Sequence, residues 1–74
     1  MVLKHEIMND NGRLKALTYI YNEKNGYMSE LMEQVGKDYA EELIAVGFVI
    51  CGYNPQVKTW RISEMAKEFY LEIC

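Results

Sequence analysis

The sequence predicts an α+β domain that is mostly helical, with a three-helix body, a two-stranded β-hairpin and a C-terminal helix. Three observations favour it. Apolar residues recur at helical spacing through residues 11–46. Two short β-branched and aromatic runs follow, separated by a Gly-Tyr-Asn-Pro turn. A serine then precedes another helical pattern. At 74 residues the chain is one domain, with a core at 11–73 and an N-terminal arm or helical turn at 1–10.

The first helix is expected at residues 11–24. Either Asp10 or Asn11 can cap it, because their side chains accept hydrogen bonds from the free amides of a first turn. Gly26 is expected to end it in the left-handed conformation. The apolar positions of this helix are Leu14, Leu17, Ile20 and Tyr21.

A short second helix is expected next, with Ser29 as its N-cap and Gly36 as its end. Its apolar stripe is Met28, Leu31, Met32 and Val35. A third helix begins near Lys37 or Asp38 and ends at Gly47. Its apolar side consists of Tyr39, Ala40, Leu43, Ile44 and Val46.

The hairpin is expected to have strands at 48–51 and 57–62 with a turn at 52–56. Since side chains alternate along a strand, Trp60 and Ile62 share one face with Lys58, and Arg61 lies on the other with Val57 and Thr59. Trp60 and Ile62 should point into the core. Ser63 should cap the last helix, whose apolar positions are Met65, Ala66, Phe69, Tyr70 and Ile73.

This order of elements resembles the winged helix-turn-helix family of small bacterial, archaeal and viral DNA-binding regulators. Three stretches carry the resemblance: "YMSELMEQVG" is similar to the second helix of the family, "AEELIAVGFVI" to the end of the recognition helix and the first wing strand, and "TWRISEMAKEF" to the second wing strand and the capped final helix. Together they cover most of residues 11–73. The family mode of binding implies a third helix in the major groove and a wing along the backbone or the minor groove of duplex DNA.

Carried onto this sequence, the resemblance implies recognition positions at Lys37, Asp38, Glu41, Glu42 and Ala45. Three of the five are carboxylates, which phosphates repel, and this departs from the family pattern. By charge, residues 28–47 hold one lysine against five carboxylates, a net charge of −4, whereas residues 48–63 hold Lys58 and Arg61 and no acid. The residues expected to contact DNA are therefore Lys37, Tyr53, Asn54, Gln56, Lys58 and Arg61.

A second hypothesis belongs to another class of protein. The acidic third helix, through Asp38, Glu41 and Glu42, could dock on a basic protein surface, as an adaptor or inhibitor would. Under this hypothesis the three carboxylates face outward. The two hypotheses differ in what the carboxylates do: they weaken DNA binding under the first and make the contact under the second.

Catalysis and cofactors are not expected. No nucleophile stands at a motif spacing from a base, and two cysteines with one histidine cannot supply four zinc ligands. No stretch resembles a signal peptide or a membrane span, so we expect a cytoplasmic protein. Apolar residues near both ends, in residues 2–8 and 65–73, predict a homodimer built from the N-terminal segment and the last helix.

Overall fold

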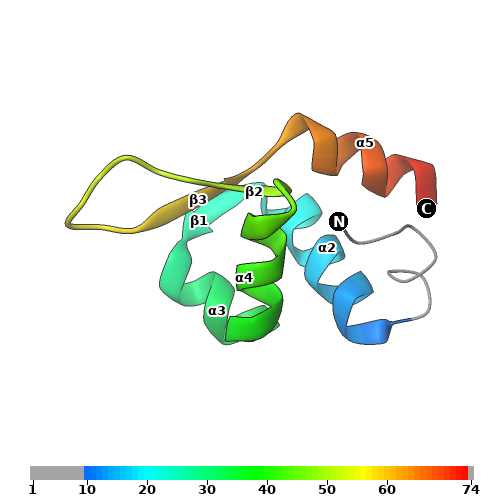
Figure 1. Cartoon of the computed structure of the whole chain (residues 1–74), viewed down its shortest axis with the longest axis horizontal. Coiled ribbons are helices and arrows are strands. Elements are labelled where there is room, and N and C mark those ends of the chain that lie inside the picture. Colours follow the sequence, from blue (N-terminus) through cyan, green and yellow to red (C-terminus); the bar gives the residue numbers. More distant parts are fainter. Residues whose placement is uncertain (1–9, 74) are drawn as a thin grey trace.

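The computed structural model describes residues 10–73, and Figure 1 shows their arrangement. The expected α+β, mostly helical architecture is confirmed, and the predicted arm at 1–10 lies outside the described residues except for Asp10. In chain order the elements are α2 (Asn11–Glu23), β1 (Asn25–Tyr27), α3 (Met28–Val35), α4 (Lys37–Ala45), β2 (Val49–Cys51), β3 (Thr59–Ile62) and α5 (Glu64–Ile73).

Helix α2 is capped by Asp10, the first of the two expected caps. Its carboxylate Oδ1 accepts hydrogen bonds from the backbone N–H groups of Gly12 and Arg13, at 2.9 and 3.2 Å. The expected end at Gly26 is wrong, because Lys24 has the positive φ of 70° and donates its backbone N–H to Ile20 O. The lysine ammonium also donates to Tyr21 O at 2.7 Å, which holds the side chain along the helix end.

A short strand, β1, was not expected from the sequence. It pairs antiparallel with β3, which also pairs with β2, so the sheet order is β1-β3-β2 and the hairpin belongs to a three-stranded sheet. Gly26 lies opposite Trp60, and a Cβ on Gly26 would be 3.3 Å from the indole Nε1. The glycine is thus needed in a strand, where it gives the indole room, and not in a helix cap.

Helices α3 and α4 follow each other with Gly36 between them. The expected cap at Ser29 is wrong, because α3 begins at Met28 and its N-cap, Tyr27, makes no side-chain hydrogen bond. Gly36 ends α3 at a φ of 92°, which an L side chain rarely adopts, and this allows the chain to turn into α4. Leu31 and Ala40 are fully buried between these helices and α2.

The core lies between the helices and the inner face of the sheet. Trp60 and Ile62 are buried there, which confirms the predicted inward face of the second hairpin strand. Ser63 accepts a hydrogen bond from Ala66 N at 3.1 Å, so the predicted cap of α5 is confirmed. Helix α5 packs through the rings of Phe69 on Phe48 and Tyr70 on Tyr21. Met65, expected on the apolar side, is instead 41% exposed.

Candidate nucleic-acid interface

The loop between β2 and β3, residues 52–58, is called the wing tip. Figure 1 shows it (yellow) projecting beyond α3 and α4, while α5 lies at the opposite end of the molecule. All its side chains are exposed, and Tyr53 is 100% exposed. Asn54 Oδ1 accepts from Gln56 N at 2.9 Å and Val57 N at 3.3 Å, so the carbonyl of this side chain shapes the turn. The amide nitrogen of Asn54 is the part that can donate outward.

Lys58 and Arg61 lie on opposite faces of the hairpin. Lys58 is on the face toward the helices, where it borders a hollow with Met28 and Met32. Arg61 is on the outer face, between Asn25 of β1 and Ile50 of β2. Both side chains are exposed, and neither forms an ion pair with any residue that the structure describes. The hairpin therefore carries one available cation on each face.

The outward side of α4 consists of Lys37, Asp38, Glu41 and Ala45, all exposed. Lys37 Nζ lies 3.9 Å from Glu41 Oε1, and an exposed pair of this kind contributes little to stability and leaves both groups free to meet a partner. One lysine and two carboxylates leave this surface slightly acidic. The structure places Lys37, Asp38 and Glu41 where the sequence predicted them.

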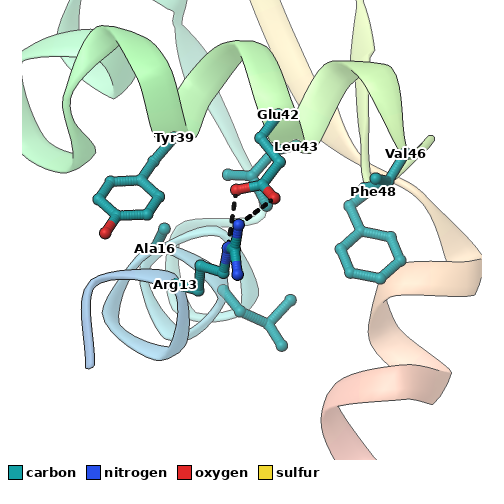
Figure 2. A pocket seen from close by; sticks show the side chains of 8 residues that line it. Arg13, Ala16, Tyr39, Glu42, Leu43, Val46 and Phe48 are labelled. Atoms are coloured by element: carbon teal, nitrogen blue, oxygen red, sulfur yellow. Dashed lines mark hydrogen bonds and ion pairs between the residues drawn. The ribbon is translucent and has the colours of Figure 1, made fainter. Parts of the chain in front are cut away.

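Glu42 does not face outward with them, and that expectation is wrong. Its carboxylate turns toward α2 and contacts the Arg13 guanidinium through both oxygens (Figure 2). Arg13 Nε donates a hydrogen bond to Oε2, and Nη2 forms an ion pair with Oε1, each at 3.1 Å. Two parallel contacts to one carboxylate are the strong geometry for arginine. We call Arg13 and Glu42 the α2–α4 clamp. Sequence reasoning missed Arg13, because a pairing across 29 residues leaves no local pattern.

A second polar contact supports the clamp. Tyr39 donates its hydroxyl to Asp10 Oδ1 at 3.2 Å. The pKa of Asp10 is held below its ordinary value, mainly by the hydrogen bond from the Arg13 backbone N–H. The Gly12 backbone N–H and the Tyr39 hydroxyl lower this pKa further, whereas desolvation raises it. The negative charge of Asp10 in turn raises the pKa of Tyr39. The side chain that caps α2 is thus also tied to α4.

The described residues offer no metal centre. Between residues 10 and 73, no group of three or more His, Cys, Asp and Glu side chains is placed to hold an ion. Within the same range, no helix is long and apolar enough to cross a membrane.

No protein-family model matches this chain, and no curated protein matches it in sequence. Its structure is similar to that of a winged-helix repressor, which confirms the winged-helix fold of the described residues. The similar structure is the crystal structure of the transcriptional repressor BigR from Xylella fastidiosa. The TM-score is 0.59 at 20% sequence identity, over 96% of this chain and 83% of the repressor. At that identity the likeness establishes the fold.

Proposed function

We propose that this protein is a winged-helix transcriptional regulator that binds duplex DNA mainly through its wing. The observation that carries the proposal is an exposed wing tip together with two exposed cations, Lys58 in the tip and Arg61 in β3. Neither cation forms an ion pair with a described residue. The segment that contains them, residues 48–63, has no acid. The repressor fold of the similar structure supports the same conclusion.

The two cations fit a wing that enters the minor groove with its tip first. That groove is about 6 Å wide and has a ridge of phosphates on each side. With Lys58 on one face of the hairpin and Arg61 on the other, each side chain meets the phosphates of a different strand. Tyr53, Gln56 and the amide nitrogen of Asn54 then reach the groove from the tip.

Helix α4 contributes less than the recognition helices of typical regulators. Lys37, at its N-terminus, is placed to contact a phosphate. Asp38 and Glu41 repel phosphates and are suited to accept hydrogen bonds from the cytosine amino group. Affinity in this proposal comes from the wing, and α4 limits which sequences are tolerated.

Assembly and location follow from the same role. A two-fold dimer, formed through α5 and the N-terminal segment, pairs two wings for two half-sites. The N-terminal part of that surface lies outside the described residues. A regulator of this kind is cytoplasmic and needs no cofactor or catalytic group.

The test compares charge variants by fluorescence anisotropy with a labelled duplex of mixed sequence at low salt. Lys58→Ala and Arg61→Ala should each weaken binding several-fold, because each removes one phosphate contact. Lys67→Ala is the matched control: it also removes one positive charge, but from α5, where Lys67 pairs with Glu64 at 3.2 Å. Equal affinities for all three variants would rule out a wing-centred interface.

A second candidate function rests on the exposed carboxylates of α4. Asp38 and Glu41 could dock on a basic protein surface. Since Glu42 holds Arg13 in the clamp, the informative variant is Asp38→Lys with Glu41→Lys, which leaves the clamp intact. Tighter duplex binding by this double variant supports the DNA proposal. Unchanged duplex binding, with lost binding to an immobilised lysine-rich peptide, would support docking instead.

A further inference from the structure

The outer face of the sheet forms a second surface, of which the duplex proposal uses only Arg61. The register places Asn25, Arg61 and Ile50 in one row across the strands, and Tyr27 and Thr59 in the next. A shallow hollow of about 510 Å³ lies over these rows, bordered by Asn25, Tyr27, Thr59 and Arg61. It opens away from the helices, because Trp60 and Ile62 of the same strand point to the core.

The floor of the hollow stays open because Gly52 continues the second row without a side chain. Gly52 donates its backbone N–H to Thr59 O at 2.9 Å, so it stands directly beside Thr59. A Cβ on Gly52 would collide with the threonine hydroxyl. The hollow therefore has backbone and a hydroxyl at its base and larger side chains at its rim.

The groups around the hollow suit an anion that carries an aromatic ring. Arg61 is exposed, pairs with no carboxylate among the described residues, and its guanidinium can hold a phosphate through two parallel hydrogen bonds. Asn25 and Thr59 add polar groups for hydrogen bonds. None of the described residues that border the hollow is acidic.

Tyr27 supplies the aromatic surface. Its side chain is 54% exposed at the outer edge of β1, a large apolar ring in contact with solvent. Tyr27 and Arg61 are diagonal neighbours across two paired strands, a spacing of about 7–8 Å between residues. One nucleotide can bridge such a pair, with its base on the tyrosine ring and its phosphate on the guanidinium.

We propose that the outer sheet face binds a nucleoside monophosphate unit, with the phosphate held by Arg61 and the base stacked on Tyr27. The unit is either a free nucleotide or an unpaired nucleotide of a single strand. This site differs from the duplex interface, which depends on Lys58 and the wing tip; Arg61 is the one side chain proposed to make contacts in both. Each can therefore exist without the other.

The test is a titration of the ¹⁵N-labelled protein, followed by the backbone amide signals, with three probes: adenosine monophosphate, a single-stranded deoxyadenylate octamer and inorganic phosphate. Signals of β1 and of residues 59–61 should shift with the first two probes, and those of α4 should not. Tighter binding of the octamer identifies a single-strand site. Binding of the mononucleotide with no gain for the octamer identifies a site for free nucleotides.

Two tyrosine variants make the test specific. Tyr27→Ala should weaken binding of the better probe about tenfold, which is the usual effect of losing one base-stacking ring. Tyr53→Ala removes the same ring from the wing tip, which the mononucleotide does not contact, and should leave the affinity for adenosine monophosphate unchanged. Thermal melting of both variants checks that the fold is retained, since both side chains are largely exposed.

Three results would overturn the proposal: no shifts at millimolar nucleotide, equal affinity for inorganic phosphate, or equal loss in the two tyrosine variants. None of them bears on the duplex proposal, which is judged by Lys58→Ala and double-stranded DNA. Conversely, duplex binding that Lys58→Ala leaves unchanged would count against the duplex proposal but would leave the nucleotide proposal untouched. The failures of the two proposals are thus distinguishable.

Discussion

At the scale of single residues, Asp10 joins the start of α2 to α4. One carboxylate oxygen accepts two backbone N–H groups of the first turn and the hydroxyl of Tyr39. Gly12 makes this geometry attainable, because a Cβ there would collide with the Tyr39 hydroxyl. The sequence indicated a cap at this position, but the contact with Tyr39 depends on how α4 crosses α2 and has no sequence pattern.

The lowered pKa of Asp10 predicts a pH-dependent contribution to stability. A carboxyl group whose pKa is lower in the folded state stabilises the fold at pH values above its ordinary pKa of 3.8, and this contribution is lost as pH falls through the lowered value. Asp10→Asn keeps a capping side chain without the charge. Its melting temperature should be below that of the wild type at pH 6, and the difference should shrink toward pH 2. A difference that stays constant between pH 6 and pH 2 would contradict the assignment.

Gly26 packs closely against Trp60 in the sheet. The indole Nε1 is buried, has no hydrogen-bond partner among the described residues and faces the space where a Gly26 side chain would be. Gly26→Ala should therefore destabilise the protein by about 1–3 kcal/mol, as overfilled cores do. Denaturant unfolding measures it. In a Trp60→Phe background, where the smaller ring leaves space, the same change should cost less; a strictly additive double variant would argue against direct contact.

At the scale of elements, the apolar stripes placed the helices, but the end signals expected at Gly26 and Ser29 were wrong, whereas in α5 the expected cap was correct. Ser63 caps that helix, and Phe69 and Tyr70 face the core as expected. The three-residue strand β1 could not be predicted, because Asn25 and Gly26 indicate a turn by themselves. It exists because the edge of β3 offers backbone partners to it, and this is a tertiary effect.

In the candidate interface, too, some features followed from local sequence patterns and others depended on tertiary contacts. Exposure of the wing residues and the opposite faces of Lys58 and Arg61 followed from strand alternation. The position of Glu42 did not, because helical spacing places it beside Glu41 and gives no sign of Arg13 on another helix. The place of Tyr27 on the outer sheet face has no sequence signal either, because it depends on the pairing of β1 with β3.

The α2–α4 clamp should show a measurable coupling. Arg13 and Glu42 are half-buried and meet through two contacts at 3.1 Å. A double-mutant cycle with Arg13→Ala and Glu42→Ala should give a coupling free energy of about 1 kcal/mol, above that of an exposed pair. The single variant Arg13→Ala does not isolate this pair, because Arg13 also lies 3.8 Å from Asp10, and the cycle removes that contribution. A coupling indistinguishable from zero in urea unfolding would mean that the clamp adds nothing to the packing of the two helices.

At the scale of the whole molecule, the wing tip and α5 lie at opposite ends (Figure 1). Helix α5 exposes Leu71 at 65% and Met65 at 41%, more apolar surface than its contact with the core requires. Under the proposed function, this separation would let one end pair with a second copy while the other binds DNA. It also explains why removing charge from α5 serves as a control for the wing.

The predicted dimer can be tested at its most exposed residue. Leu71→Glu places a charge in the proposed interface but leaves the core untouched, because the side chain points to solvent. Sedimentation equilibrium should show that the wild type is a dimer and that the dimer dissociation constant of the variant is at least tenfold larger. A wild-type protein that stays monomeric at high concentration would exclude this arrangement.

The most direct test of the DNA proposal is the salt dependence of duplex binding. With wing contacts to phosphates, the logarithm of the association constant falls linearly with the logarithm of salt concentration, and Lys58→Ala flattens the slope by about one unit. The Lys67→Ala variant should keep the wild-type slope. Absence of duplex binding at low salt, or a slope that Lys58→Ala leaves unchanged, would contradict the proposed wing interface.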